Sequence, residues 1–236
     1  MRRKLLLSGA AALVAIGLAG AGGYIYFFSS LRSSPPSLAL SASPTTGSAT
    51  ASTGLAGTWT VTNASVARYR VKELFVGETA KHDAVAQTAS VTGTLTVSGD
   101  SSGFQASGIT VTADLSSLHS IDTVAGRNVS QRDGIVSREL DVQQFPTAKF
   151  TATSASVPAS VTSGKADITV PGTLTIHGVT KNVTVTGQAQ VVGDKIEVAG
   201  SVAINMADYG LSPPQVPFTA VDPTATIEFD LFLTKT

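Results

Sequence analysis

Strict alternation of apolar and polar residues on both sides of a short turn constrains this chain more than any other feature. Residues 172–185 read GTLTIHGVTKNVTV, in which Leu and Ile alternate with Thr before His177-Gly178 and Val alternates with Thr near the end. A period of two residues is typical of a strand with one buried and one solvated face. The segment predicts a β-hairpin, with the polar residues 180–182 in its connection.

The same alternation recurs through most of residues 57–236. Seven further segments show it, at residues 59–61, 65–76, 89–97, 104–115, 147–157, 195–206 and 224–234. Gly-containing turns separate them at the spacing of an all-β sandwich or barrel. The first segment, with Trp59 and Val61, predicts an edge strand. Residues 127–140 lack alternation and predict a helical turn or two over an opening.

Composition excludes several classes of function. The chain has no Cys, which removes disulfides, thiolate nucleophiles and lipidated Cys anchors. Its formal net charge is zero, but all four charged residues before residue 57 are basic, so residues 57–236 carry 12 basic and 16 acidic residues. A mildly acidic domain without a basic stripe argues against nucleic-acid binding.

The N-terminus predicts a membrane anchor. Three basic residues precede an apolar run at residues 5–28, which would span about 36 Å as a helix and so cross a bilayer core of about 30 Å. Residues 1–28 therefore predict a single-pass anchor in the cell membrane, with the C-terminal domain outside the cytoplasm. The A-x-A pattern at residues 19–21 leaves a cleaved signal peptide, and a secreted protein, as the alternative.

Residues 29–56 separate this anchor from the domain. They are rich in Ser, Thr, Pro and Ala and have no periodicity. Such a segment buries too little apolar surface to offset the entropy of ordering its backbone. We expect a disordered linker that leaves the orientation of the domain at residues 57–236 unfixed.

The residues that usually carry catalysis do not form a pattern. His82, His119 and His177 lie in separate segments, without the spacing of a zinc site or the signature of a catalytic triad. His82 is expected in a loop and His177 in the hairpin turn. We predict no catalytic residue, metal site or cofactor, and no enzyme. A closed barrel of about eight strands can be filled by side chains or can hold one small ligand, and periodicity leaves both open.

Three segments resemble the YceI-like domain family. Residues 132–150, RDGIVSRELDVQQFPTAKF, are similar to its R-D-x-x-L-x-S-x-x-x-L-D-V-x-x-(Y/F)-P-x-x-x-F signature, and residues 172–183 match its G-x-L-T-I-H-G-V-T-K-x-V segment. Residues 204–211, INMADYGL, resemble its I-N-R-x-D-(F/Y)-G-I motif. The resemblance implies an exported bacterial protein with an extended, antiparallel, lipocalin-like barrel. Its tunnel would take up a polyisoprenoid or another long-chain amphiphilic lipid.

The resemblance and the inward alternation together give the candidate ligand-binding residues. These are Tyr69, Val71, Leu74, Leu95, Val97, Ile109, Val111, Phe145, Phe150, Leu174, Ile176, Val202, Ile204, Tyr209, Phe218, Ile227, Phe229 and Leu231. Ala64 and Met206 stand where the family often has His and Arg, so we expect a different head-group preference. Arg132 and Asp133 are expected to form a structural pair rather than to bind a head group.

The sequence thus predicts a membrane-tethered protein that sequesters or carries a lipid. Two alternatives stay open. One is a solidly packed barrel at the cell surface that binds a partner protein, and the more remote one is an enzyme that acts on a lipid-linked substrate through His177. The sequence also leaves open whether the domain forms a homodimer.

Overall fold

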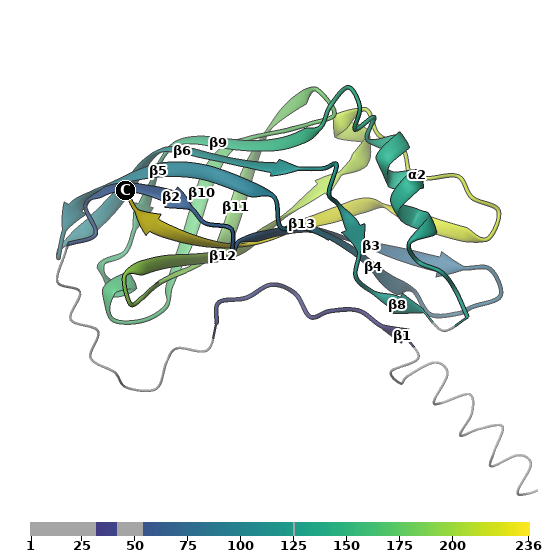
Figure 1. Cartoon of the computed structure of the whole chain (residues 1–236), viewed down its shortest axis with the longest axis horizontal. Coiled ribbons are helices and arrows are strands. Elements are labelled where there is room, and N and C mark those ends of the chain that lie inside the picture. The colour runs from purple at the N-terminus through teal and green to yellow at the C-terminus, as the bar shows by residue number, and fades with distance from the viewer. Residues whose placement is uncertain (1–31, 42–53, 125) are drawn as a thin grey trace, which may run out of the picture.

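The computed structural model describes residues 32–41, 54–124 and 126–236, and its main feature is a closed antiparallel barrel (Figure 1). Eight strands pair in the order β12-β11-β10-β9-β6-β5-β2-β13, and β13 pairs with β12 to close the ring. These strands are β2 (Gly57–Val61), β5 (Val91–Asp100), β6 (Gly103–Asp114), β9 (Thr147–Val157), β10 (Ala166–Ile176), β11 (Val179–Val192), β12 (Lys195–Asn205) and β13 (Thr219–Lys235). The predicted all-β barrel is confirmed.

The barrel wall divides at one end. One edge of β13 pairs with β2 near its C-terminus and with β3 (Val66–Phe75) over the rest of its length. From β3 the wall continues into β4 (His82–Thr88) and the short β7 (His119–Ser120). Helix α2 (Gln131–Glu139) lies across this end, as Figure 1 shows. We call this end, with the β3–β4 turn and the β12–β13 loop, the mouth end, and the opposite one the far end.

Four short elements complete the described fold. They are β1 (Arg32–Ser33), which pairs with β8 (Thr123–Val124), and the 3₁₀ turns η1 (Ala159–Thr162) and η2 (Met206–Tyr209). Two clusters of buried apolar side chains occupy the interior. The larger includes Trp59, Ile109 and Leu231 inside the eight-strand ring, and the other includes Val71 and Ile204 toward the mouth end.

The connection of the predicted hairpin is tighter than expected. Strands β10 and β11 pair from Ala166↔Ala189 to Ile176↔Val179, so only His177 and Gly178 connect them. Both have positive φ, 51° and 72°, as a two-residue turn that matches the twist of the flanking strands requires. The prediction that residues 180–182 belong to the connection is therefore wrong, because they are already within β11.

Two further predictions about strands are wrong. Trp59 lies on an interior strand, because β2 pairs with β5 on one side and β13 on the other. His82 lies on β4 and is buried rather than in a loop. Three consecutive residues of β4, Ala84 to Ala86, are buried because both faces of this strand are covered, so the period of two residues disappears.

Part of the predicted linker is ordered. Residues 34–41, which we call the strap, lie along the outside of the barrel. Residues 29–31 and 42–53 of the predicted linker, and the predicted anchor at residues 1–28, lie outside the described residues. Within the described ranges, no helix combines the length and the apolar character needed to span a bilayer.

Candidate functional site

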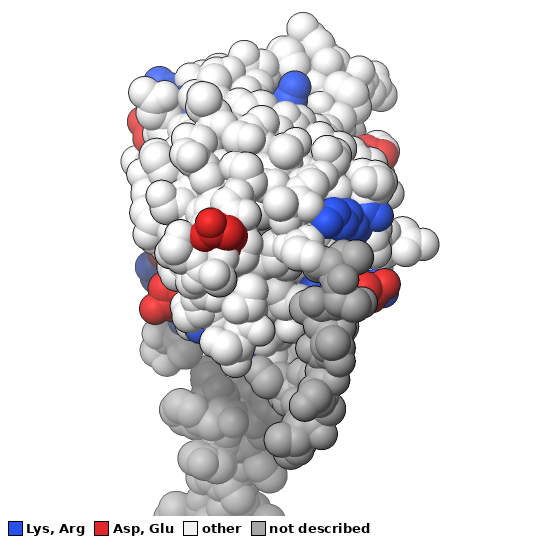
Figure 2. All heavy atoms as spheres, turned by 90° about the vertical axis from the view of Figure 1, so that its left-hand side faces the viewer, with Lys and Arg blue, Asp and Glu red and all other residues white. Residues whose placement is uncertain are grey.

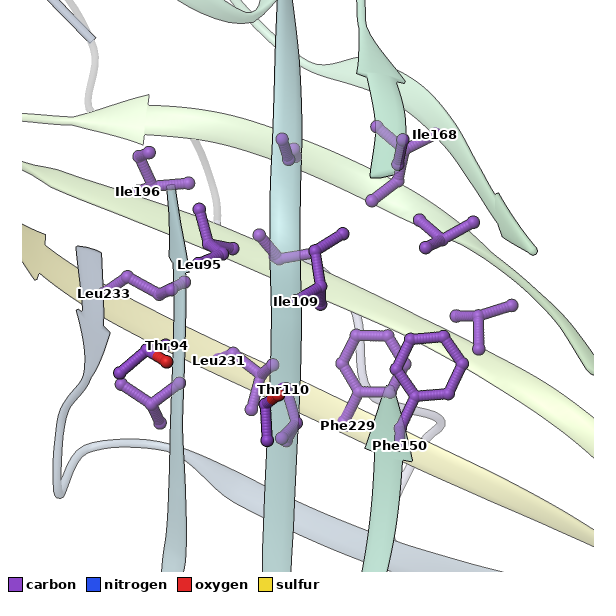
Figure 3. Close-up of a pocket in the computed structure, with 18 of the residues that line it drawn as sticks. Thr94, Leu95, Ile109, Thr110, Phe150, Ile168, Ile196, Phe229, Leu231 and Leu233 are labelled. Carbon is purple, nitrogen blue, oxygen red and sulfur yellow. The ribbon is translucent and has the colours of Figure 1, made fainter. Parts of the chain in front are cut away.

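The interior of the eight-strand ring is hollow. A cavity of about 170 Å³, which we call the bore, lies between the strands and is shown in Figure 3. The same measure gives about 10–15 Å³ for the space that one water molecule needs, so the interior is not packed solid. Its lining is apolar except for the hydroxyl residues Thr94, Thr110 and Ser156.

Glycines in the wall make room for two aromatic rings of the bore. Phe150 and Phe229 both line it, and their rings lie beside the apolar side chains of the neighbouring strands in Figure 3. A Cβ at Gly172 would lie 2.6 Å from the Phe150 ring, and one at Gly200 would lie 2.8 Å from the Phe229 ring. The two rings therefore lie against bare backbone, which leaves space toward the axis of the barrel.

A second cavity continues the bore toward the mouth end. It measures about 160 Å³ and is lined by β3, by the α2 segment and by the loop between β12 and β13. We call it the mouth cavity. Five residues line both cavities and form what we call the waist, namely Ala67, Ala113, Ala148, Leu174 and Ile227. Three of these five are Ala, so only small side chains stand between the two cavities at these positions.

The mouth cavity, unlike the bore, contains charged and phenolic groups. The Tyr69 hydroxyl is buried and has no hydrogen-bond partner among the described residues. Burial raises the pKa of Tyr69, so its hydroxyl stays protonated and can donate. A buried donor without a partner costs about 1–3 kcal/mol, and a ligand oxygen at this position would recover that energy.

Arg132 of α2 lines the same cavity, but its guanidinium is already engaged by groups of the protein. Its Nε and Nη2 contact the Glu73 carboxylate at 3.0 and 3.2 Å. Its Nη1 and Nη2 contact both oxygens of Asp122 at 2.7 and 3.1 Å, and Nη1 also reaches the Ser120 hydroxyl at 3.3 Å. Four of these contacts are hydrogen bonds from Nη1 and Nη2, and the contact of Nε with Glu73 is an ion pair.

The predicted pairing of Arg132 with Asp133 is wrong, because Arg132 pairs with other carboxylates. Asp133 instead accepts hydrogen bonds from the backbone N–H and the hydroxyl of Ser120, at 2.9 and 2.6 Å. Burial alone would raise the pKa of Asp122, but the hydrogen bonds from His82 and Arg132 outweigh it and hold that pKa well below its usual range. Burial raises the pKa of Glu73 despite the neighbouring Arg132.

The candidate ligand residues fall into three groups. Leu95, Val97, Ile109, Val111, Phe150, Leu174, Val202, Ile227, Phe229 and Leu231 line the bore. Tyr69, Val71, Ile176 and Ile204 line the mouth cavity. Leu74, Phe145, Tyr209 and Phe218 line neither cavity.

Three members of the last group lie elsewhere in the fold. Tyr209 is buried in η2, and its carbonyl oxygen lies 3.3 Å from His177 Nδ1. Phe145 packs edge-on against the His177 ring at 4.9 Å between centroids. Phe218 is 51% exposed at the mouth end.

Sequence reasoning missed part of the lining. Val185, Ile196 and Leu233 line the bore, and the alternation of their strands could have selected them. The small waist residues and the charged residues Glu73 and Arg132 gave no signal as lining. A small side chain can be recognised as part of the waist only when it is known which strands face each other across the barrel.

The fold and the site define a hollow, lipocalin-like antiparallel β-barrel with an apolar interior and a polar group at one end. The chain belongs to the family of the YceI-like domain, whose model matches residues 59–233.

Similar proteins and structures agree with this family. A UPF0312 protein of Pseudomonas putida strain F1 is 31% identical over 135 residues, which cover 55% of this chain and 65% of that protein. The UPF0312 protein PputW619_0484 of P. putida strain W619 is 28% identical over 135 residues, which again cover 55% of this chain and 65% of that protein. The chain thus spans about two thirds of the length of these curated relatives.

Two solved structures share the fold. A polyisoprenoid binding domain from Saccharophagus degradans, implicated in plant cell wall breakdown, gives a TM-score of 0.51 at 16% identity, covering 75% of this chain and 98% of that one. Burkholderia cenocepacia BcnA gives 0.50 at 18% identity, covering 73% and 98%.

Proposed function

We propose that the protein binds one long-chain lipid, a polyisoprenoid or a similar amphiphile, in the bore and the mouth cavity. The observation that carries this proposal is the pair of adjoining cavities that share the waist residues, an apolar bore and a mouth cavity with polar groups beside its apolar lining. The S. degradans domain, which shares the fold, is a polyisoprenoid binding domain, and this supports the same assignment.

Burial of an apolar chain supplies the binding energy in this account. Each CH₂ removed from water contributes about 0.8 kcal/mol, before the cost of immobilising the lipid. No charged group is needed along the bore. The Tyr69 hydroxyl is the donor that a head-group oxygen would meet, whereas the Arg132 guanidinium is already paired with two carboxylates of the protein.

The geometry favours binding over catalysis. The His177 ring is held by Phe145 and by the carbonyl of Tyr209, and His177 lines neither cavity. A catalytic role for His177 on a bound lipid therefore has no support. The hollow interior likewise argues against the solidly packed barrel of the protein-interaction alternative.

We further propose that the protein is exported and held at the membrane by residues 5–28. The basic residues before this apolar run and its length support the assignment. The barrel would then act outside the cytoplasm, where it would sequester or carry its lipid.

A charge placed inside the mouth cavity tests lipid binding. Ile176→Glu puts a carboxylate on the inner face of β10, whereas Thr175→Glu puts one on the outer face at the neighbouring position. With added polyprenyl lipid, we expect uptake to be lost in Ile176→Glu and kept in Thr175→Glu. Circular dichroism checks that both variants fold. Equal uptake by two folded variants would refute the proposal.

A further inference from the structure

The strap fixes where the N-terminal part of the chain leaves the barrel. Ser34 donates to the carbonyl of Asp83 on β4, and farther along Ser41 donates through its backbone N–H and its hydroxyl to Glu197 on β12, at 2.7 and 2.8 Å. The Leu40 side chain is buried. In Figure 1 this segment runs along the barrel from the mouth end toward the far end.

Additional contacts hold the strap near both of its ends. Arg70 donates to the carbonyl of Pro35 at 2.9 Å, and the same guanidinium pairs with Glu228 on β13. Gln190 on β11 donates to the carbonyl of Ser41 and to Glu197. The strap thus crosses β4, β3, β13, β12 and β11, and it is bonded at both of its ends.

The first described residues lie at the mouth end. Arg32 pairs with Val124 of β8, and the backbone N–H of Arg127 donates to the Val124 carbonyl. The Arg127 guanidinium lies 4.2 Å from the centre of the Phe75 ring, at the tip of β3. The apolar run ends at residue 28, so at most about 14 Å of extended chain separates it from Arg32.

The tip beside this exit is apolar. Val76 and Phe218 are the exposed large hydrophobic residues of the described chain, at 68% and 51%. They are neighbours, because the Val76 N–H donates to the Phe218 carbonyl at 3.0 Å. The loop that carries Phe218 also forms the rim of the mouth cavity through Leu211 and Pro214.

The two ends of the barrel differ in the side chains that they expose. Close to the apolar tip, two lysines are neutralised by ion pairs, Lys72 with Asp83 at 2.6 Å and Lys81 with Asp222 at 2.7 Å. The far end, seen in Figure 2, shows scattered charges of both signs on a mostly uncharged surface. The exposed apolar pair is at the mouth end only, within the described residues.

We propose that the mouth end docks on the bilayer that anchors the chain, with Val76 and Phe218 in the lipid interface. The mouth cavity then opens onto the membrane, and a lipid passes between bilayer and bore without crossing water. This inference rests on the proposed lipid binding and on the proposed anchor. It differs from the expectation that the linker leaves the orientation of the domain unfixed, because the strap holds Arg32 at the mouth end.

The absence of Cys in the chain allows a direct measurement of depth in the membrane. Full-length Thr79→Cys, in the β3–β4 turn, and Ser101→Cys, in the β5–β6 turn at the far end, are labelled with a nitroxide and reconstituted in phosphatidylcholine vesicles. We expect the label at residue 79 to be several-fold more accessible to oxygen than to a water-soluble nickel chelate. The label at residue 101 should show the reverse. Adding Val76→Ser and Phe218→Ser should return residue 79 to the aqueous profile, and salt should have little effect.

Three results would overturn the inference. The first is an aqueous profile at both positions. The second is protection of residue 79 from both reagents, which a second copy or a protein partner would give. The third is release of the chain from the vesicles by washing. Native mass spectrometry of the same samples reports bound lipid separately. A lipid-loaded chain with an aqueous label at residue 79 refutes docking alone, and a docked chain without lipid refutes the proposed function alone.

Discussion

Arg132 and Asp122 form a two-pronged ion pair, with Nη1 and Nη2 at 2.7 and 3.1 Å from the two carboxylate oxygens. On its other side the guanidinium contacts Glu73 of β3. One cation on α2 thus contacts two carboxylates from different parts of the mouth end. The pair ties the helix to the barrel at the rim of the mouth cavity.

Replacing Arg132 should destabilise the fold strongly. Arg132→Met leaves Glu73 and Asp122 buried without their cation, and loss of one partner from a buried pair costs about 3–5 kcal/mol. Urea unfolding measures the change. Arg138→Met, in the exposed last turn of α2, is the control, and equal unfolding free energies for the two variants would contradict the role of Arg132.

Asp230→Asn should stabilise the protein at neutral pH. Burial and the nearby Glu197 carboxylate raise the pKa of Asp230 to about 6, against the opposing effect of Arg68. Because the pKa is higher in the folded state, Asp230 contributes to the free energy of unfolding fully below pH about 3.9. That contribution is lost as the pH rises through about 6. Asn stays neutral and avoids that loss.

We expect a gain of about 1–2 kcal/mol for Asp230→Asn at pH 7.5, since partial solvation of the carboxyl reduces the full effect. The gain should shrink toward zero at pH 4. Urea unfolding at both pH values measures it, with Asp194→Asn in the exposed β11–β12 turn as the control. A gain that does not depend on pH would disprove the assignment to this carboxyl.

Ala67→Phe should make the site selective for short chains. The ring would fill the waist and divide the bore from the mouth cavity, because Ala67 lines both. Exclusion of two CH₂ groups already costs about 1.6 kcal/mol, or more than tenfold in affinity. Affinity for long polyprenyl lipids should fall by at least that factor, and affinity for short ones should change little.

The control for the waist variant is Thr153→Phe, which places the same ring on an exposed position of β9. Competition binding with lipids of graded length measures the effect. Parallel losses for every chain length would show that Ala67 does not control a passage.

Leu40→Ser should release the strap without unfolding the barrel. Exposure of a buried Leu costs about 1.5–3 kcal/mol, and the hydrogen bonds that the strap makes with Glu197 and Arg70 are only partly buried. Amide hydrogen exchange should become faster in residues 34–41 and stay unchanged in β9 and β10. Ala39→Ser, at an exposed position, should have no such effect. Protection that persists in Leu40→Ser would mean that the buried Leu does not hold the strap.

The period of two residues predicted most of the barrel, because most strands bury one face only. It failed for β4, where Ala84, Val85 and Ala86 are all buried, and the apolar alternation of residues 172–185 did not reveal that the turn contains only two residues. The resemblance supplied the expectation of a tunnel, since alternation cannot distinguish a hollow interior from a packed one.

Contacts between distant parts of the chain could not be predicted. Ser41 and Glu197 are 156 residues apart, and Arg132 and Glu73 are 59 apart. Composition alone therefore predicted disorder for the strap, and proximity in sequence suggested Asp133 as the partner of Arg132. The waist escaped notice because Ala67 and Ala148 matter through their small size.

Native mass spectrometry of the full chain, released from detergent micelles, tests the central claim of a lipid in the barrel most directly. We expect one adduct per chain, with the mass of a long-chain or isoprenoid lipid, which is retained in Thr175→Glu and absent from folded Ile176→Glu. A bare mass for the unmodified chain, unchanged after polyprenyl lipid is offered, would contradict it.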